Sequence, residues 1–173
     1  MNREQLEHAI RSACDISGDN EVYIFGSQAI LGQYPNADDK LTRSIEVDAY
    51  PKNKPETVDK IDGALGENSP FHHTHGFYVH GVSIETASLP EGWQDRTKKV
   101  QDYMDEDKIG WCIEVHDLAA SKLMAYREKD IRFVRTMIVE NLINLEVLRK
   151  RLQMTDTEFS VKERALNWVD KIS

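Results

Sequence analysis

Two carboxylates separated by one residue, Glu46 and Asp48, stand in the stretch SIEVDAYP. Alternate residues of a β-strand project from the same face, so these two side chains would lie within a few ångströms of each other. Like charges at that separation repel unless a cation lies between them. Mg²⁺ prefers oxygen ligands and is commonly held by one or two carboxylates together with substrate phosphates. The spacing therefore indicates a site for Mg²⁺ or Mn²⁺, and the alternative is a strand with a solvated acidic face.

A glycine and a hydroxyl, Gly26 and Ser27, directly follow the apolar run VYIF. Glycine at a strand-to-helix turn lets the backbone approach a ligand closely, and the free N–H groups of a helix start attract anions. The serine hydroxyl could donate to a phosphate oxygen. The chain contains neither GxxxxGK[ST] nor GxGxxG, which excludes a P-loop and a dinucleotide-binding turn. The pattern favours a phosphate site of another type, and the alternative is an ordinary helix start capped by Ser27.

The elements that must position these residues follow from the hydrophobic periodicity. Apolar residues at helical spacing predict helices at 3–16, 27–33, 56–65, 116–130 and 131–152. Strand patterns occur at 22–25, 44–50, 77–89 (one or two strands) and 109–115. Asp117 is the expected N-cap of its helix, and Ser160 with Glu163 predicts a capping box for a last helix. Residues 89–100 and the histidine-rich stretch FHHTH are expected to be loops.

This order of elements predicts an α+β or α/β domain followed by a C-terminal helical bundle. The chain has 22 Lys and Arg against 30 Asp and Glu, a net charge of −8, which disfavours non-specific binding to nucleic acid. No apolar run is long enough for a membrane span, so no membrane association is expected. The first residues are charged and amphipathic and the two cysteines form no CxxC motif, so a cytoplasmic protein without disulfides is expected.

In combination, these features resemble the signature of the nucleotidyltransferase superfamily, the group related to DNA polymerase beta. Its pattern is hydrophobic-Gly-[Gly/Ser], a spacer, and [Asp/Glu]-hydrophobic-[Asp/Glu]-hydrophobic, which here reads IFGSQAIL and IEVDAY. Further along, LPEGWQDR and HDLAASKLMAYREKDIRFV resemble the branch of AbiE-type toxins and related nucleotidyltransferase-like proteins. That branch carries a lysine on a helix and then arginine-x-lysine-aspartate; these are Lys122, Arg127, Lys129 and Asp130 here.

The resemblance implies a mixed β-sheet flanked by helices in an α+β fold, with residues 1–115 as the nucleotidyltransferase-like core and 116–173 as helices packed on it. It implies that Gly26 and Ser27 hold the triphosphate of an NTP and that Lys122 neutralises its charge. Glu46 and Asp48 would hold the metal and act in catalysis, and Asp130 would orient Lys122 or complete the polar site. The alternative for Lys122 and Asp130 is surface ion pairing.

Two positions depart from the pattern of that branch. Glu46 stands where aspartate is more common, and the third acid of many members has no clear match; Glu85, expected in a strand, is the candidate third metal ligand. The implied function is metal-dependent transfer of a nucleoside monophosphate from an NTP to an acceptor hydroxyl. The acceptor would be the 3′ end of tRNA, a protein or a small molecule, and the protein would be a toxin with an antitoxin partner. The alternatives are a non-catalytic nucleotide-binding or protein-interaction member of the fold and a purely structural partner.

Overall fold

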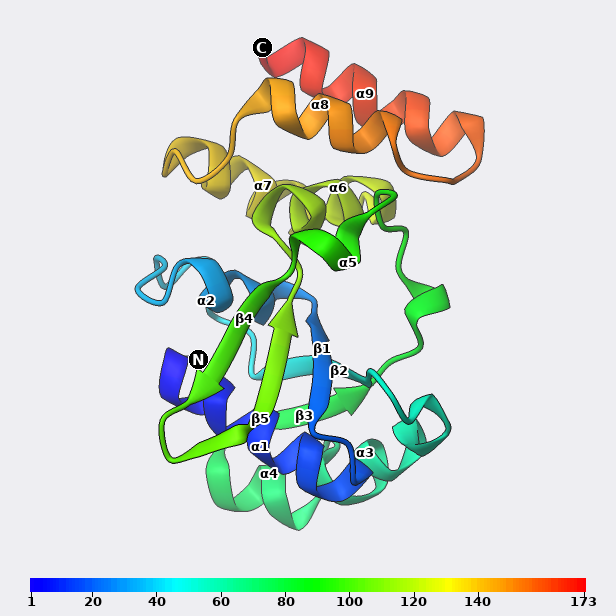
Figure 1. Ribbon diagram of the computed structural model, residues 1–173. Coiled ribbons are helices and arrows are strands. Elements are labelled where there is room, and N and C mark those ends of the chain that lie inside the picture. The colour runs from blue at the N-terminus through cyan, green and yellow to red at the C-terminus, as the bar shows by residue number, and fades with distance from the viewer.

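Five strands form one mixed sheet in the order β3-β2-β1-β5-β4 (Figure 1). The computed structural model describes residues 1–173. The strands are β1 (Glu21–Phe25), β2 (Glu46–Pro51), β3 (Tyr78–Gly81), β4 (Lys98–Asp102) and β5 (Asp105–Cys112). The central strand β1 is antiparallel to β2 and parallel to β5, β2 is parallel to β3, and β4 is antiparallel to β5.

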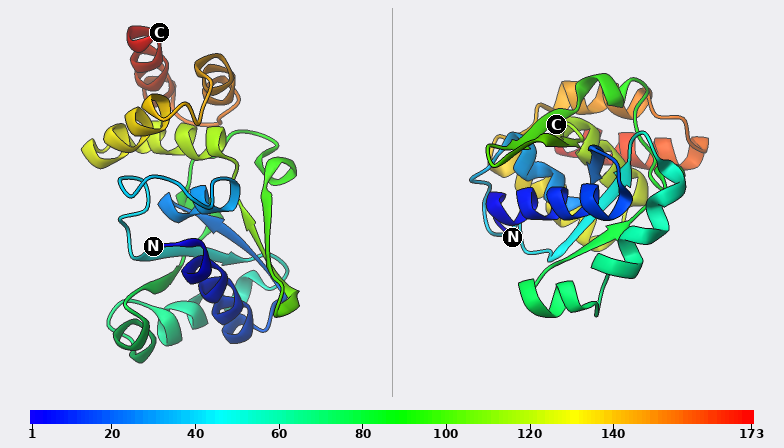
Figure 2. Two further views of the ribbon diagram at one scale, coloured as in Figure 1. Left: turned by 90° about the vertical axis from the view of Figure 1, so that its left-hand side faces the viewer. Right: turned by 60° about the horizontal axis from the view of Figure 1, so that its bottom comes forward.

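Figure 2 shows the last four helices beyond one end of this sheet. The first helix, α1 (Arg3–Ser17), lies across the sheet and contacts all five strands, and α3 (Val58–Leu65) and α4 (Pro70–His75) lie beside β3. The helices are α1 (Arg3–Ser17), α2 (Ile30–Gln33), α3 (Val58–Leu65), α4 (Pro70–His75), α5 (Trp93–Arg96), α6 (Val115–Ala125), α7 (Glu128–Val139), α8 (Leu145–Gln153) and α9 (Phe159–Ile172). Three short 3₁₀ turns, η1 (Ser27–Ala29), η2 (Pro55–Thr57) and η3 (Ile84–Thr86), complete the chain. None of the helices is both long and apolar enough to cross a bilayer.

Local sequence explains the elements around the predicted site. In β2, Val47 and Ala49 are fully buried while Glu46, Asp48 and Tyr50 of the opposite face are half-buried, as the period of a strand requires. Ile45, which continues the apolar alternation of Val47 and Ala49 in the sequence, lies before the strand and is exposed. Strands β1 and β3 flank β2 within the sheet, α1 packs against β2, and the carboxylates face a cavity.

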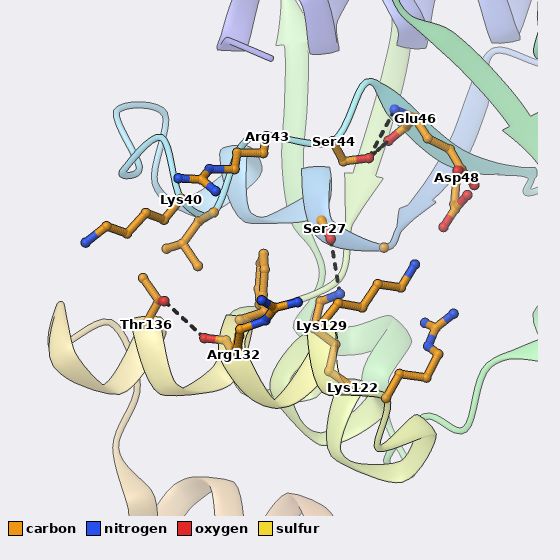
Figure 3. A pocket seen from close by; sticks show the side chains of 14 residues that line it. Ser27, Lys40, Arg43, Ser44, Glu46, Asp48, Lys122, Lys129, Arg132 and Thr136 are labelled. Atoms are coloured by element: carbon orange, nitrogen blue, oxygen red, sulfur yellow. Dashed lines mark hydrogen bonds between the residues drawn. The ribbon is translucent and has the colours of Figure 1, made fainter.

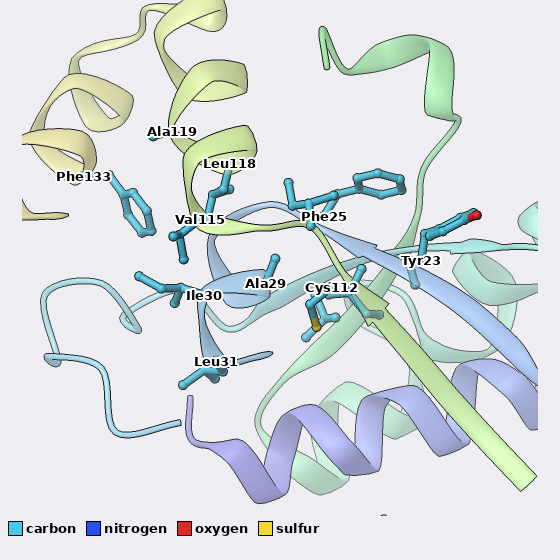
Figure 4. Packing of buried hydrophobic residues seen from close by; sticks show 14 of the residues in the cluster. Tyr23, Phe25, Ala29, Ile30, Leu31, Cys112, Val115, Leu118, Ala119 and Phe133 are labelled. Carbon is cyan, nitrogen blue, oxygen red and sulfur yellow. The ribbon is translucent and has the colours of Figure 1, made fainter. Parts of the chain in front are cut away.

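One hydrophobic core connects the sheet to the C-terminal helices (Figure 4). The same buried cluster contains Ile24 of β1, Leu118 of α6, Phe133 of α7 and Leu148 of α8. The predicted α+β class, a mixed sheet flanked by helices, is therefore confirmed. The division into 1–115 and 116–173 stays a prediction, and the core runs continuously across it.

Several predicted elements differ in the structure. The stretch 89–100, predicted as a loop, contains α5 and the start of β4, an edge strand whose residues are mostly charged or polar around a buried Val100. FHHTH lies in α4 rather than in a loop, with Ser69 as its N-cap. The predicted helix over 131–152 is broken between α7 and α8, where Asn141 has a φ of 55°.

Two capping predictions were wrong. Glu114 rather than Asp117 caps α6, because the Glu114 carboxylate accepts from the N–H groups of His116 and Asp117. Asp117 is instead fully buried inside the first turn. The last helix begins at Phe159 after Glu158, without the side-chain cap predicted for Ser160.

Candidate active site

The turn after β1 brings the Gly26–Ser27 pair beside the two acids of β2. Phe25, the last residue of β1, is opposite Asp48 in the antiparallel register, so the next residue of the chain lies against the Asp48 side chain. Gly26 has a φ of 66°, and a Cβ atom there would lie 2.5 Å from Oδ2 of Asp48. Only glycine fits this position, because both the left-handed backbone and the close carboxylate exclude a side chain.

Glu46 and Asp48 meet a third group, His80 of β3. Strands β2 and β3 are paired in parallel with Glu46 opposite Tyr78 and Asp48 opposite His80, so all four side chains share one face. His80 Nδ1 lies 3.2 Å from Oε1 of Glu46 and 3.5 Å from Oδ1 of Asp48, and the Tyr78 hydroxyl donates to Oε2 of Glu46 at 2.9 Å. One ligand atom each from Glu46, Asp48 and His80 lie within 4.8 Å of one another.

The charges of the two acids are strongly linked. Burial, together with the neighbouring Glu46 carboxylate, raises the pKa of Asp48 to about 7. Burial acts in the same direction on Glu46, but hydrogen bonds with Asp48, Tyr78 and His80 outweigh it and hold the pKa of Glu46 below its ordinary value. At neutral pH Glu46 is therefore ionised, whereas Asp48 is only partly ionised.

These residues fit a divalent cation. Asp48 Oδ1 is buried and accepts no hydrogen bond. The carboxylates of Glu46 and Asp48 lie side by side, and the group that contacts both is His80 rather than a lysine or an arginine. A cation at this point would satisfy Oδ1 and remove the repulsion between the acids. Carboxylate oxygens suit Mg²⁺ and Mn²⁺, and the imidazole of His80 adds a ligand that Mn²⁺ accepts more readily than Mg²⁺ does.

Lys122 of α6 faces the same turn from the other side. Its ammonium donates to Oγ of Ser27 at 3.1 Å, lies 3.5 Å from Oδ1 of Asp130 and stands 4.4 Å above the ring of Phe133. Asp130 is fully buried, and it also accepts from Nε of Arg127 at 2.7 Å. Burial lowers the pKa of Lys122, although Asp130 opposes that shift. The lysine is thus a partly desolvated cation held at the serine hydroxyl.

A cavity of about 540 Å³ connects these groups (Figure 3). The turn and β2 form one wall, the segment from Lys40 to Ser44 a second, and α7 a third. The cationic residues of its lining are Lys40, Arg43, Lys122, Arg127, Lys129 and Arg132. In a chain with a net charge of −8, this concentration of positive charge beside two acids suits a polyphosphate with a bound cation.

Most of the residues predicted for the site converge in the structure, and one does not. Gly26, Ser27, Glu46, Asp48 and Lys122 all line the cavity, and Asp130 lies directly behind Lys122. Glu85 is in the exposed turn η3 rather than in a strand, and it is not part of the group of converging ligand atoms. Its role as a third metal ligand stays a prediction with no support from this placement.

His80 occupies the place of the third group, and the sequence reasoning missed it. The available signal was its alternation with Tyr78 inside the strand pattern FYVHGV. That alternation shows which residues share a face, but it does not show that this face meets Glu46 and Asp48. The pairing of β3 with β2 decides that.

The comparisons with known proteins agree with this geometry. A family model described as "Nucleotidyltransferase of unknown function (DUF6036)" matches residues 4–171. Neither the search of curated proteins nor the search of solved structures gives a match. The match spans the β1 turn, the acids of β2, His80 and the Lys122 helix together. The chain therefore belongs to this family of nucleotidyltransferases of unknown function.

Proposed function

We propose that the protein transfers a nucleoside monophosphate from an NTP to an acceptor hydroxyl and releases pyrophosphate. In this reaction the acceptor oxygen forms a bond to the α-phosphorus, the bond from that phosphorus to the bridging oxygen of the β-phosphate breaks, and the hydroxyl proton is lost to water. The observation that carries the proposal is the convergence of Glu46 and Asp48 with Ser27 and Lys122 on one cation-lined cavity. Acids that bind a divalent cation and a basic channel for a polyphosphate are the two parts that phosphoryl transfer requires.

Each residue has a proposed task in this reaction. Ser27 and Lys122 bind the phosphates that leave, and Asp130 positions Lys122 through its contact at 3.5 Å. Glu46 and Asp48 hold the divalent cation, Mg²⁺ or Mn²⁺, which when bound neutralises charge on the phosphate oxygens. The Gly26 turn lets the α-phosphate approach Asp48 without a side chain in the way.

The test is binding and transfer with the same protein preparation. Wild type and Asp48→Asn are each titrated with the four NTPs by calorimetry, with Mg²⁺, with Mn²⁺ and with EDTA. The same proteins are then incubated with NTPs labelled on the α-phosphate, total RNA and cell lysate. We expect metal-dependent binding of at least one NTP and a labelled product, both lost in Asp48→Asn. No binding and no product with any NTP and either metal would refute the proposal.

A second candidate, a nucleotide-binding member without transfer activity, is favoured by two residues. Glu46 is one methylene longer than the aspartate common in the AbiE-type branch, and a histidine rather than an acid completes the cluster. Metal-dependent NTP binding that is lost in Asp48→Asn, with no transfer by wild type or by Glu46→Asp, would identify this function. Transfer that appears only in Glu46→Asp would show that the glutamate suppresses activity.

The resemblance to AbiE-type proteins supports a narrower proposal on the biological role. The protein would act in the cytoplasm as the toxin of a toxin–antitoxin pair, with the 3′ end of tRNA as one acceptor and an antitoxin protein as partner. Induced expression should then arrest growth, and Asp48→Asn, an isosteric change at the cavity, should not. Equal growth after induction of both forms would remove the toxin role and leave the transfer reaction to be judged by the labelled-NTP experiment.

A further inference from the structure

A second cavity, of about 260 Å³, adjoins the basic one. Gly26, Asp48, Lys122 and Arg127 line both cavities, so Asp48 is part of the border between the two spaces. The second cavity lies between the end of β1, the helix α6 and the segment 82–89, which continues directly from the strand that carries His80.

The two cavities differ in chemistry. The second one is lined by apolar side chains together with the neutral hydroxyls of Thr86, Ser88 and Ser121, and its only charged residues are the three shared with the basic cavity. The apolar side chains of its wall include Phe25, Val82, Leu89, Ile113, Leu118 and Met124. An apolar wall with a few hydroxyl groups is typical of a site for a small uncharged ring rather than for a phosphate.

The geometry of the transfer reaction relates the two cavities. In phosphoryl transfer the attacking and the leaving oxygens are roughly in line, on opposite sides of the phosphorus. The basic cavity carries the cations that suit the leaving pyrophosphate, and Asp48, where the α-phosphate would be held, is its border with the second cavity. The attacking hydroxyl therefore approaches from the second cavity.

We propose that the second cavity is the acceptor subsite and that it selects an uncharged hydroxyl with an apolar body, the phenol of a tyrosine side chain. This inference rests on the proposed transfer function. The acceptor oxygen of the phenol would bond to the α-phosphorus at Asp48, its proton would pass to water, and pyrophosphate would leave through the basic cavity. The product is a nucleotidylated tyrosine.

The other two acceptor classes fit this lining less well. An RNA 3′ end brings a phosphodiester next to its terminal ribose, and RNA sites provide cations for such phosphates; beyond the border residues the second cavity provides none. A small-molecule acceptor with several positive charges, such as an aminoglycoside, needs several acids, and Asp48 is the only acid in the lining. The lining therefore favours a neutral acceptor.

A first experiment measures binding without any nucleotide. The probe is N-acetyl-L-tyrosinamide, observed by saturation-transfer NMR with wild type, Ala87→Phe and Ala64→Phe. Ala87 lines the second cavity, in extended backbone that accepts a larger residue, whereas Ala64 of α3 is a half-buried alanine that lines neither cavity. We expect the signal with wild type and Ala64→Phe and its loss with Ala87→Phe. If Ala87→Phe does not fold, Ser121→Leu fills the same space from α6.

A second experiment measures transfer. With an NTP labelled on the α-phosphate, Ala87→Phe should lower labelling of the tyrosinamide by about 100-fold, while calorimetry shows unchanged metal-dependent NTP affinity. A short RNA ending in CCA is offered as the competing acceptor. Labelling of the RNA but not of the tyrosinamide would overturn the inference. So would a wild-type protein that does not bind the tyrosinamide, or an Ala87→Phe variant that still binds it. Wild type that binds the tyrosinamide but no NTP would refute the transfer function and leave the neutral-ring assignment of the cavity supported.

Discussion

At the scale of single residues, Asp48 is held in a position that is unfavourable for its charge. The carboxylate is buried against Glu46, its pKa is raised to about 7, and Oδ1 has no hydrogen-bond partner. Residues retained in unfavourable surroundings are frequent at sites that bind or react. The metal proposed for this site would remove the penalty, which makes protein stability a measure of metal binding.

The pH dependence of stability follows from that pKa. Because the folded pKa of Asp48, about 7, exceeds its unfolded value, the folded chain binds more protons than the unfolded chain between about pH 4 and pH 7. Asp48 therefore costs stability increasingly as the pH rises through this window, and the cost is constant above it. Without metal, Asp48→Asn should raise the free energy of unfolding by about 1–3 kcal/mol at pH 8 and by less at pH 5.

Urea denaturation at both pH values in EDTA checks this prediction. Added Mg²⁺ or Mn²⁺ should stabilise wild type at pH 8 and should not stabilise Asp48→Asn. A variant that is no more stable than wild type at pH 8 would show that Asp48 is not strained in the metal-free protein.

Lys122 is the residue whose loss should weaken nucleotide binding most. Its side chain is only 12% exposed and its ammonium contacts Ser27, so it would meet a phosphate with little competing water. Lys122→Met should lower the affinity for metal-bound NTP by about 30-fold or more, as expected for a desolvated charge contact. The fold should persist, because Arg127 still pairs with the buried Asp130 at 2.7 Å.

The matched control for this variant is Lys129→Met. Lys129 lines the same cavity but is exposed, so its contribution to binding should be several-fold smaller. Calorimetric titration of both variants measures the difference. Equal losses would mean that the general positive charge of the cavity, and not the placement of Lys122 at Ser27, decides affinity.

At the scale of elements, the turn from β1 to η1 determines the spacing between the acids and Ser27, the residue proposed to bind phosphate. Gly26→Ala adds a Cβ atom that would lie 2.5 Å from Asp48 Oδ2 and also strains a φ of 66°. The substitution should displace Asp48 and abolish metal-dependent NTP binding. It should also destabilise the fold by more than the roughly 1–2 kcal/mol that a left-handed backbone costs an ordinary residue.

Gly76→Ala measures the cost of a side chain at a positive φ without a close contact. The ψ of −169° at Gly26, unlike the ψ of 9° at Gly76, is accessible almost only to glycine, so the backbone part of the cost is larger at Gly26. Gly76 ends α4 with a φ of 75°, and a Cβ atom there would meet nothing within 4 Å. This variant should show the backbone cost of about 1–2 kcal/mol in urea denaturation and unchanged NTP binding. If Gly26→Ala were no worse than Gly76→Ala in both measurements, the contact with Asp48 would have no importance for the site.

Some elements could be predicted from local pattern and others could not. Strand β1 follows from a short apolar run and β2 from the alternation of apolar and polar residues. Helix α1 follows from its apolar spacing and from the glycine that ends it. The edge strand β4, KKVQD, has one buried apolar residue, Val100, so no local hydrophobic pattern marks it. The apolar spacing over 131–152 continues through the break at Asn141. Helices α7 and α8 both pack on the same core, so the apolar residues of both are spaced as if they belonged to one helix.

At the scale of the whole molecule, Asp117 of α6 connects the C-terminal helices to α5, the short helix that precedes β4. This fully buried carboxylate accepts from Nε of Arg96 at 2.8 Å, and Nε of Arg151 of α8 lies 2.9 Å from its other oxygen. With the shared core, this pair of contacts leads us to propose that residues 1–115 and 116–173 unfold as one unit. Calorimetric and van't Hoff enthalpies of wild type should then agree.

Asp117→Ala should therefore destabilise the whole chain. Removing one partner of a buried ion pair costs about 3–5 kcal/mol, because the remaining charges stay buried without compensation. The control is Arg149→Ala, which breaks the exposed pair with Asp170 and should cost less than about 1 kcal/mol. Urea denaturation followed by tryptophan fluorescence and by circular dichroism checks both values. Two separate transitions in wild type would contradict the proposal of one unit.

The sequence by itself determined the chemistry of the acidic face of β2 and of the turn beside it. Glu46 and Asp48 share a side of a strand because the strand period is two, and the Gly26–Ser27 turn follows directly from the run that precedes it. Both features depend on neighbours within a few residues, so their types and spacing were enough to predict carboxylates and a phosphate turn. The tertiary structure decided which distant groups join them.

His80 reaches the acids through the register between β2 and β3, and Lys122 reaches Ser27 across 95 positions of sequence through the packing of α6 on the core. The same packing divides the site into a basic and an apolar cavity on the two sides of Asp48. Register and helix placement depend on how the entire core fills its volume, and no local pattern contains that information.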